Sequence, residues 1–578
     1  MSRSKRNSAA SGPRAPADKV IPLVKIPYAA ANRSDELVFL PLGGVGEIGM
    51  NLSLYGYAGQ WLMIDLGISF ADDTMPGLDI IMADPTFIAE RREQLAGLVV
   101  THAHEDHIGA IQHLWPRLRC PIYATPFTAS VLRAKLGEAG LLTSVQIHEV
   151  PLSGHFTVGP FDLELITLTH SVPEPNAVVL RTPLGTLLHT GDWKFDPEPQ
   201  VGPTADLAAL TRLGEEGVLA LIGDSTNALR AGEAGSEADV RASLIDLVGR
   251  YDQRVAIACF ASNVARLQSA AAAAAANDRR VALVGRSLWR MEQAARENGY
   301  LADTAPFLTD EEAAYLPRDK VLLICTGSQG EPRSALARIA ADDHPHIVLD
   351  QGDTVIFSSR IIPGNEKSIG KLQNQLAGLG VDIVTEHEHF VHVSGHPARD
   401  ELTRMYQMIQ PRIAVPVHGE ERHLIAHAKL AEECQVSETI IAENGDMIRL
   451  APGLAEIIDR VPVGRLGLDG KALIPLDGAA MKGRQRMIFN GSAVSTVVLD
   501  ERGHLLSAPR VTVHGLLEAG SEIANNLPGE VERAVKGIPA NGRGDDEVVR
   551  EAVRLAIRRH LNMTIGKKPV TDVHVVRI

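Results

Sequence analysis

Residues 101–109 read Thr101-His102-Ala103-His104-Glu105-Asp106-His107-Ile108-Gly109 and directly follow the apolar, strand-like run 95–100. This stretch puts three imidazoles and two carboxylates into six consecutive positions. Neutral histidine and ionised aspartate are ligands of divalent zinc or manganese, and leaving such groups buried without partners costs several kcal/mol. His102 and His104 project to one side of an extended chain, whereas Asp106 and His107 follow in a turn. The pattern predicts one loop that serves two metal ions.

Two alternative interpretations of this stretch stay open. His104 to His107 resembles the His-Glu-x-x-His helix of zinc proteases, but its second histidine comes one position early and Ile108-Gly109 offers no helical continuation. A solvated polar loop without metal is the other alternative, although a run of this composition is far rarer than a single histidine.

Three later apolar runs also end in metal-ligand residues. Residues 163–169 lead to His170, residues 186–191 to Asp192, and residues 413–417 to His418. One histidine, an aspartate able to bridge two ions and a last histidine would complete two coordination spheres. We therefore expect these three residues to join the 101–109 loop.

The ligand order His-x-His-x-Asp-His, His, Asp, His resembles the metallo-β-lactamase superfamily, and the match covers most of residues 1–450. The resemblance implies an αββα sandwich. It implies that one ion is held by His102, His104 and His170, the other by Asp106, His107 and His418, and that Asp192 is shared. Asp65 matches an early buried aspartate of the superfamily, which implies that it orients a ligand imidazole through the other ring nitrogen.

A glycine-rich segment earlier in the chain fits a different kind of site. Gly44-Val45-Gly46-Glu47-Ile48-Gly49 matches the dinucleotide-binding fingerprint, which must open a helix. Residues 51–55 instead alternate like a strand, and 61–64 continue a hairpin. We therefore place the segment in the first strands of the β-lactamase domain and expect no nucleotide cofactor.

Length and composition set broader limits. The 578 residues, 45% hydrophobic and 22% charged, have enough core material for two to four domains. The sequence has no apolar run of 18 residues and no signal peptide, so we expect a cytoplasmic protein without a membrane partner. The scattered cysteines are expected to be reduced core residues: Cys120, Cys259, Cys325 and Cys434.

The net charge is −14, which by itself argues against a nucleic-acid partner. Residues 1–34 carry seven basic side chains against one acidic, so the rest of the chain is near −20. This leader is expected to be disordered. It could tether a polyanion, or it could be a solubilising tail.

The chain between Asp192 and His418 is too long for a simple connection. It contains strand-like runs at 255–260, 281–284 and 321–325 with helical segments between them, one nearly pure alanine over 270–276. A domain inserted between two metal ligands must lie over the metal site. We expect it to select the substrate.

The insertion resembles the β-CASP nucleases, and specifically the ribonuclease J family, over nearly the whole chain from residue 36. The segments that carry the resemblance are Gly223-Asp224-Ser225-Thr226-Asn227, Glu237, Phe260 to Arg266, Gly285-Arg286-Ser287, Cys325 to Glu331, Phe357 to Glu366 and His392-Val393-Ser394-Gly395-His396. The ending 561–569 departs from the family pattern.

The residues of two of these segments suit phosphate binding. His392 to His396 combine two imidazoles, a hydroxyl and a glycine with an accessible N–H, and Ser262 and Asn263 begin a helix after a strand. The resemblance implies that RNA phosphates are held by Ala261, Ser262, Asn263, His392, Val393, Ser394, Gly395 and His396. Ser262 as a plain helix cap and His392 as a structural histidine are the alternatives.

The resemblance also implies an activity. Two ions, zinc with manganese or magnesium as alternatives, would activate water and stabilise negative charge on the phosphate. Asp106 belongs to this catalytic set. His396 would protonate the leaving 3′ oxygen, with Glu237 as the candidate residue that orients it. The products would carry a 5′ phosphate. The expected enzyme is a 5′-to-3′ exonuclease of single-stranded 5′-monophosphate RNA and also an endonuclease, acting in RNA maturation and decay.

The expected domains are a leader over 1–34, a β-lactamase domain over 35–222 and 386–450, a β-CASP domain over 223–385, a linker over 451–464 and a C-terminal α/β domain over 465–578. The resemblance implies that the last domain mediates a homodimer or tetramer, with degradation or ribosome-associated partners further candidates. Its Arg550, Arg554, Arg558 and Arg559 are expected to form a solvated helix face. Asp79 and Asp446 are candidate ligands of a structural calcium.

Two other function classes compete with the ribonuclease. A metallo-hydrolase of a small ester, thioester, lactam or lactone would be indifferent to loss of His396. A noncatalytic RNA-binding or scaffold protein would have a broken ligand set, and no ligand is missing here.

Overall fold

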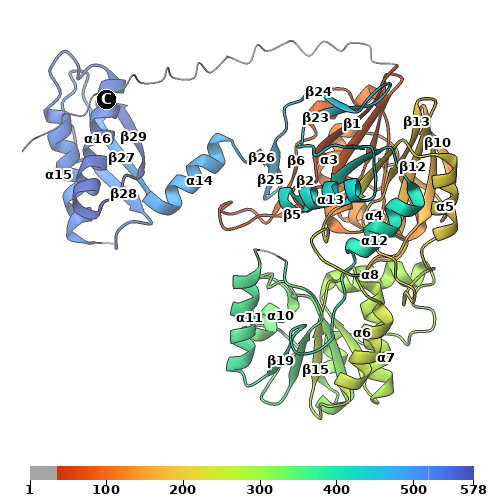
Figure 1. Ribbon diagram of the computed structural model, residues 1–578. Helices are drawn as coiled ribbons and strands as arrows, with labels where there is room; N and C mark the ends of the chain where they lie inside the picture. The colour runs from red at the N-terminus through yellow and green to blue at the C-terminus, as the bar shows by residue number, and fades with distance from the viewer. Residues whose placement is uncertain (1–34, 363, 519) are drawn as a thin grey trace, which may run out of the picture.

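The computed structural model describes residues 35–362, 364–518 and 520–578, so the predicted leader 1–34 lies outside the described residues. Figure 1 shows three bodies: a β-sandwich in orange and red completed by teal segments, a green α/β domain beneath it, and a blue C-terminal domain to one side. The green domain is inserted within the sequence of the sandwich domain, as predicted from the number of residues between Asp192 and His418.

The first domain is built on two facing sheets. In spatial order, the first contains β24 (Glu456–Arg460), β23 (Asp446–Ala451), β1 (Leu37–Gly43), β3 (Leu52–Tyr57), β4 (Gln60–Ile64), β7 (Leu95–Val99), β8 (Ile122–Ala124) and β9 (Ile147–Glu149). The second contains β10 (His155–Val158), β11 (Phe161–Thr167), β12 (Asn176–Thr182), β13 (Gly185–His189), β14 (Ala220–Asp224), β20 (Ile413–Val417) and β22 (Glu438–Thr439).

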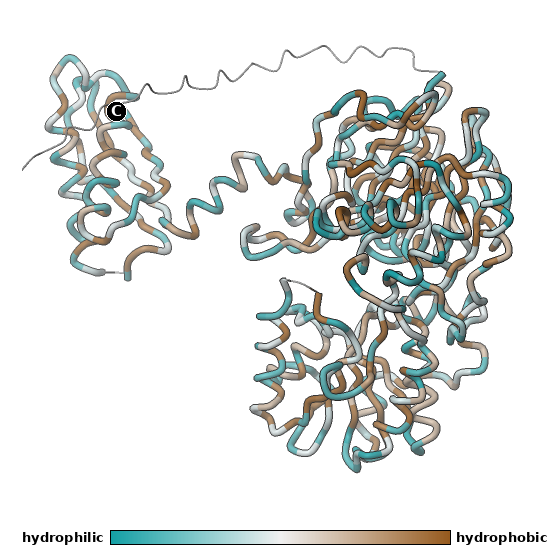
Figure 2. The backbone as a smooth tube through the Cα atoms, in the orientation of Figure 1, coloured by the Kyte–Doolittle hydropathy of each residue, from teal (hydrophilic) through white to brown (hydrophobic). Residues whose placement is uncertain are grey.

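Helices cover the outer faces of both sheets. They are α1 (Thr86–Ala89), α2 (Glu105–Ile108), α3 (Ile111–Leu118) and α4 (Pro126–Glu138) on the first side, and α5 (Leu207–Glu216), α12 (Arg399–Ile409) and α13 (Glu421–Glu433) on the second. Phe39 and Leu62 pack against Leu163 and Ile222 between the sheets. Because most strands are buried on both faces, they are continuous apolar runs, which appear brown inside the domain in Figure 2. This confirms the αββα sandwich.

Strand direction brings the predicted ligands together. β11, β13, β14 and β20 all run the same way, because β12 is antiparallel to both β11 and β13 while the later pairs are parallel. Their carboxyl ends therefore meet at one edge of the sandwich, where they are joined by the loop after β7. His170, Asp192 and His418 each follow one of these strand ends.

The inserted domain is a parallel sheet flanked by helices. Its strands, in spatial order, are β16 (Arg280–Val284), β17 (Val321–Cys325), β15 (Val255–Ala258), β18 (Thr354–Phe357) and β19 (Asp382–Val384). Its helices are α6 (Glu237–Val248), α7 (Val264–Ala276), α8 (Arg286–Glu297), α9 (Asp310–Ala314), α10 (Ala335–Ala340) and α11 (Glu366–Gly378). The alanine run lies in α7, as predicted.

The chain passes between the two domains twice. We call residues 225–236 the outgoing crossing and residues 385–398 the return crossing. The fully buried Arg266 of α7 links the ends of the two crossings. Its guanidinium pairs at 3.1 Å with both oxygens of Glu237, which directly follows the outgoing crossing, and it donates to the carbonyls of Ser358 and of Val391 in the return crossing. The inserted domain is thereby fixed at its attachment points.

The predicted linker 451–464 differs in the structure. It contains β24, which pairs antiparallel with β23 and so extends the first sheet. β25 (Arg465–Asp469) and β26 (Ala472–Pro475) then form a small sheet with β5 (Ile68–Phe70) and β6 (Ile80–Ala83) of the first domain, and β2 (Val45–Gly46) pairs with β21 (Gly419–Glu420). The linker was predicted from the prolines and glycines of 451–464, and the strand between them was missed.

The C-terminal domain follows the helix α14 (Ala479–Asn490), which spans the gap visible in Figure 1. It consists of β27 (Ser492–Leu499), β28 (Arg510–His514), α15 (Glu522–Lys536), α16 (Asp546–Ile565) and β29 (Val570–Arg577), with a core of its own. Arg550 and Arg554 form ion pairs with Glu547 and Glu551 on the surface of α16. Among the described residues, we find no helix with the length and hydrophobicity needed to cross a bilayer.

Candidate metal centre

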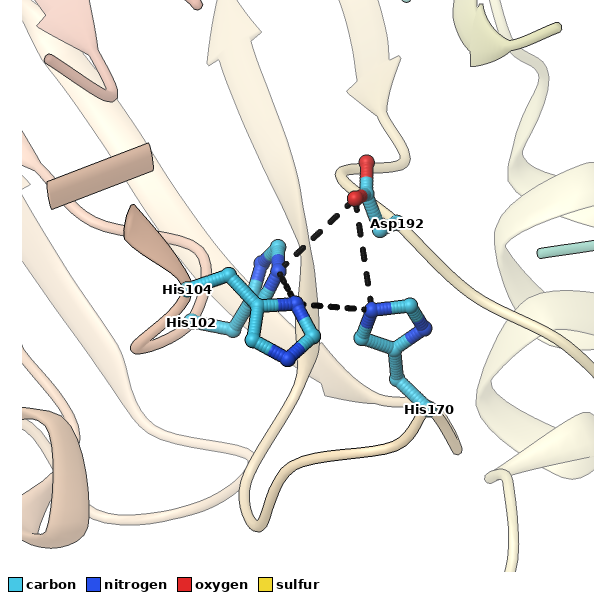
Figure 3. A group of neighbouring side chains, drawn as sticks. All are labelled: His102, His104, His170 and Asp192. Carbon is cyan, nitrogen blue, oxygen red and sulfur yellow. Dashed lines mark hydrogen bonds and ion pairs between the residues drawn. The ribbon is translucent and has the colours of Figure 1, made fainter. Parts of the chain in front are cut away.

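Four predicted ligands form a first group at the edge of the sandwich, drawn in Figure 3. Nδ1 of His104 lies 3.1 Å from Nε2 of His102 and 3.0 Å from Nε2 of His170. Oδ2 of Asp192 faces the same point, 3.8 Å from the His102 nitrogen and 4.0 Å from that of His170. The structure thus brings together residues from three separate segments.

A second group shares Asp192 with the first. Its other members are Asp106, His107 and His418. Oδ2 of Asp192 lies 3.1 Å from Nε2 of His107 and 3.5 Å from Nε2 of His418, while Oδ2 of Asp106 lies 3.6 Å from the His418 nitrogen. All seven predicted ligands are therefore gathered, with Asp192 between the two groups.

Hydrogen bonds on the far side of three imidazoles fix which nitrogen faces the site. Nδ1 of His170 contacts the Gly395 carbonyl at 2.5 Å, and Nδ1 of His107 contacts Asp65 Oδ2 at 2.6 Å. Nδ1 of His418 is 3.0 Å from the amide oxygen of Asn51. Because carbonyl, carboxylate and amide oxygens accept, each Nδ1 donates. In the neutral imidazole, Nε2 then presents a lone pair to the site.

Burial and charge act on these histidines in different ways. Burial and the neighbouring imidazoles hold the pKa of His102 and His170 well below the usual value, and burial lowers the pKa of His104 to about 4. Burial opposes protonation of His107 as well, but the Asp192, Asp106 and Asp65 carboxylates raise its pKa. Most of the cluster is thus neutral imidazole, the form that binds metal.

These residues fit divalent metal ions. Oδ1 of Asp192 and Nε2 of His418 are buried and have no hydrogen-bond partner within the described part of the chain, which is costly unless a cation binds there. Two nitrogens on one zinc ion, each at about 2.0–2.1 Å, lie roughly 3.3 Å apart in a tetrahedron, close to the separations in the first group. Imidazole and carboxylate donors suit zinc or manganese.

Local backbone structure presents the ligands. Asp106 and His107 lie in α2, so the chain does turn helical at 105–108, contrary to our expectation, although the helix has only four residues. Lys135, 5% exposed, anchors this turn through an ion pair with Glu105 at 2.7 Å. Asp65 and His418 adopt left-handed φ values of 62° and 52°, a strained conformation typical of residues whose side chains must be aimed at a site.

His396 stands beside the shared aspartate. Its Nδ1 lies 2.8 Å from Oδ2 of Asp224 and 3.8 Å from Oδ2 of Asp192. Burial disfavours its charged form, but Asp224 and Asp192 raise the pKa of His396 to about 9. Asp224, which we had noted only as part of a family segment, is the partner that orients His396. Glu237 pairs with Arg266 instead of contacting His396, so its expected orienting role is wrong.

Gly395 contacts one of the predicted metal ligands, His170. Its carbonyl accepts from His170, and a Cβ at this position would lie 2.5 Å from Cε1 of that imidazole. Ser394 is also engaged by protein, since its Oγ accepts from Asn227 Nδ2 at 2.8 Å. The return crossing therefore helps to build the first ligand group.

Gly395→Ala is expected to displace His170 and to lower metal affinity and activity about 10- to 100-fold. Metal analysis after dialysis, together with an activity assay, checks this. Gly370→Ala is the matched control, because a Cβ at Gly370 in α11 meets nothing within 4 Å. Full metal content in Gly395→Ala would contradict the assigned contact.

The other predicted phosphate-binding residues lie where α7 meets the return crossing. Asn263 caps α7 by accepting from Arg266 N at 2.9 Å, so the cap is Asn263 and not Ser262. Nδ1 of His392 is buried without a partner among the described residues. Burial and then the positive charges of Arg266, Arg360, Lys194 and Arg230 hold the pKa of His392 well below its usual value. His392 thus lies in an electropositive environment.

The two candidate calcium ligands lie in different settings. Asp79 forms an exposed ion pair with Arg333 of the inserted domain, and Asp446 accepts from Arg460 at 2.8 Å. Neither belongs to any of the ligand groups found among the described residues, so the structural ion stays a prediction.

Comparison with known proteins decides the family. Models for four domains match in order: the metallo-β-lactamase superfamily at 46–247, the ribonuclease J β-CASP domain at 252–376, the Zn-dependent metallo-hydrolase RNA specificity domain at 380–441, and the ribonuclease J C-terminal domain at 479–578. Ribonuclease J of Sinorhizobium meliloti is 46% identical over 94% of this chain and 98% of its own. The chain belongs to the ribonuclease J family.

More distant members of the ribonuclease J family match over similar lengths. Ribonuclease J of Thermus thermophilus is 36% identical over 93% of this chain and 94% of its own, and ribonuclease J2 of Bacillus subtilis is 32% identical over 93% and 97%. A solved Enterococcus faecalis protein of unknown function shares the fold, with a TM-score of 0.50 at 16% identity, covering 72% of this chain and all of that one. Family membership confirms a metal-dependent ribonuclease with a β-CASP insertion and RNA-binding capacity. It also places the divergent C-terminal region within the family.

Proposed function

We propose that this chain hydrolyses RNA phosphodiesters at two metal ions, acting as a 5′-to-3′ exonuclease on 5′-monophosphate RNA and also as an endonuclease. The observation that carries the proposal is the pair of ligand groups that share Asp192 directly beside His396. A mononuclear site would leave one of these groups without a function.

The two ligand groups support a proposed set of ligands for each ion. His102, His104, His170 and Asp192 would hold one ion, and Asp106, His107, His418 and Asp192 the other. We propose zinc, with manganese or magnesium as alternatives. When bound, the ions supply positive charge that activates water and stabilises the phosphate oxygens. Asp65 and Asn51 keep two of the imidazoles in the orientation that this binding needs.

His396 is the proposed general acid. Its Nδ1 is engaged with Asp224, so Nε2 is the nitrogen available to the substrate. As water adds to phosphorus and the bond to the 3′ oxygen breaks, His396 Nε2 gives its proton to that oxygen. The products carry a 5′ phosphate and a 3′ hydroxyl. Exonuclease and endonuclease cleavage share this step.

The surroundings of His392 support a pocket for a 5′ phosphate. Its partnerless nitrogen lies among cationic side chains, and Arg266, in the first turn of α7, donates to Val391 O at 3.0 Å. This contact places the helix start, with Ala261 to Asn263, beside His392. Helix N-termini and cations together favour phosphate. A pocket of limited size would exclude a triphosphate.

RNA labelled at its 5′ end and bearing one 5′ phosphate is expected to yield labelled mononucleotide at once, in a reaction abolished by a chelator. The same RNA with a 5′ triphosphate is expected to react at least about 10-fold more slowly, because the added charge and bulk find no partners. Gel analysis of 5′- and 3′-labelled RNA measures both. The proposal would be contradicted if labelled mononucleotide were released first from the 3′-labelled RNA. It would also be contradicted if the 5′-monophosphate and 5′-triphosphate RNAs were cleaved at equal rates. Turnover of a chromogenic lactam or thioester without RNA cleavage would favour the small-molecule hydrolase.

We also propose a cytoplasmic location and a homodimer or tetramer formed through the C-terminal domain. Three consecutive apolar side chains at the end of α14, the helix that leads directly into this domain, support the second point, since Met487, Ile488 and Phe489 are 39%, 60% and 74% exposed. A partner surface would cover them.

A further inference from the structure

One buried carboxylate holds three separate backbone segments. Glu401, in the first turn of α12, is 1% exposed. Its Oε1 accepts from the N–H of Phe195 at 2.9 Å, and its Oε2 accepts from the N–H groups of Ala234 and Ala398, each at 2.9 Å. A carboxylate that accepts several N–H groups forms strong, charge-assisted bonds with each.

Each of these segments carries part of the proposed active site. Phe195 comes three residues after Asp192, and Ala398 comes two residues after His396. Ala234 lies in the outgoing crossing, which begins directly after Asp224. Asp192, Asp224 and His396 must be correctly placed relative to one another for proton transfer. They lie on, or directly before, the three backbone segments that Glu401 joins.

Helix capping accounts for only one of the three contacts. A residue in the first turn commonly accepts from the N-cap N–H, which here is Ala398. Phe195 and Ala234 belong to other segments and contribute nothing to α12. Further bonds tie the same segments, because Arg399 N donates to Arg230 O at 2.9 Å and Asn227 Nδ2 to His396 O at 3.0 Å. Within the described residues, Glu401 is the one side chain that forms hydrogen bonds with all three segments.

We propose that Glu401 is a positioning residue, which holds His396 in place against Asp192 and Asp224 so that its proton can reach the leaving 3′ oxygen. The inference rests on the proposed general-acid role of His396. In the described part of the chain, the hydrogen bonds of Glu401 go to backbone N–H groups and not to a metal ligand. Its effect passes through the backbone at residues 195, 234 and 398.

Glu401→Gln preserves size but replaces one oxygen with an NH₂ group, which cannot accept. Either the Phe195 N–H or the Ala234 and Ala398 N–H groups then lose their acceptor, and one segment is released. A displacement of about 1 Å can cost up to roughly 10²-fold in rate. We expect kcat on RNA to fall about 10- to 100-fold, with a smaller change in KM.

The test compares RNA with the same RNA carrying sulfur in place of the scissile 3′ oxygen. A 3′-thiolate leaves without a proton, so cleavage of this linkage does not need a general acid. For Glu401→Gln, kcat should fall at most about threefold on the thio-substrate but 10- to 100-fold on RNA. His396→Ala should show the same difference between the two substrates more strongly. Metal content should stay at the wild-type level in both.

Asp353→Asn is the matched control. Asp353 is fully buried in the inserted domain and accepts from the N–H groups of Arg254 at 3.1 Å and Asp350 at 2.9 Å, but its partners carry no site residue. This variant should leave the ratio between the two substrates unchanged. Any general loss of stability then appears in both variants, whereas the shift in ratio appears only in Glu401→Gln.

The proposed role of Glu401 would be overturned if kcat of Glu401→Gln fell equally on both substrates, or on neither. If Glu401→Gln does not fold by circular dichroism, Glu401→Asp serves instead, since it keeps the charge but is one methylene too short to reach all three N–H groups. Failure of both variants to fold would make Glu401 a residue of general stability and also overturn the proposal. Failure of the general-acid role of His396 can be told apart from failure of the Glu401 proposal. In that case kcat of His396→Ala would fall equally on both substrates.

Discussion

Replacing Asp192 with asparagine is expected to lower kcat on RNA at least roughly 10³-fold and to strip metal from the protein. The reason lies in the position of this carboxylate, whose Oδ2 lies within 4.0 Å of nitrogens of five imidazoles: His102, His107, His170, His396 and His418. Asparagine keeps the volume but removes the charge that both ligand groups share. Elemental analysis of the dialysed protein and cleavage of labelled RNA measure the two effects.

Glu164→Gln is a suitable control for this substitution. Glu164 is 3% exposed on β11, but its partners are Arg181 and Arg212 rather than site residues. The control should therefore keep its metal and most of its activity even if it loses some stability. An Asp192→Asn protein that retained both metal and near-normal cleavage would mean that Asp192 does not bridge the ligand groups.

Much of this centre could be predicted from the sequence because its ligands follow strands. Apolar runs that end in histidine or aspartate can be recognised locally, and parallel strands bring their carboxyl ends to one edge. Asp192 and His418 are more than two hundred residues apart, yet each is identified by the apolar run before it. The same argument predicted that the inserted domain is attached beside the site, since the chain enters and leaves it between two ligands.

Apart from Asp65, which was predicted to orient a ligand imidazole and contacts His107, the residues that support the centre could not be predicted in this way. Asn51 reaches His418 across 367 positions, and Gly395 reaches His170 across 225, through contacts that no local pattern encodes. Asp224 is buried at the end of β14. The sequence identified it only as part of a family segment and gave no sign of its contact with His396. Glu237 was assigned to His396 because it is an acidic residue of the family pattern, but it pairs with the buried Arg266, for which the described residues offer no other carboxylate partner.

His396→Ala is expected to lower kcat on RNA by about 10²- to 10⁴-fold while both metal sites stay loaded. The expectation has two grounds. Asp224 holds Nδ1 of His396, and His396 is not one of the seven proposed metal ligands, so both ions keep their ligands when the imidazole is removed. Single-turnover cleavage of 5′-monophosphate RNA, paired with metal analysis, separates the loss of a proton donor from the loss of metal.

Asp224→Asn provides the graded comparison. The amide can still accept from Nδ1 of His396 but no longer stabilises its positive charge, so the loss should be smaller than in His396→Ala, about 10- to 100-fold. The double variant should be little worse than His396→Ala alone, because Asp224 acts through that histidine. If the two losses instead multiply, Asp224 has a separate role at the metal centre, and the orientation of His396 is not its main contribution.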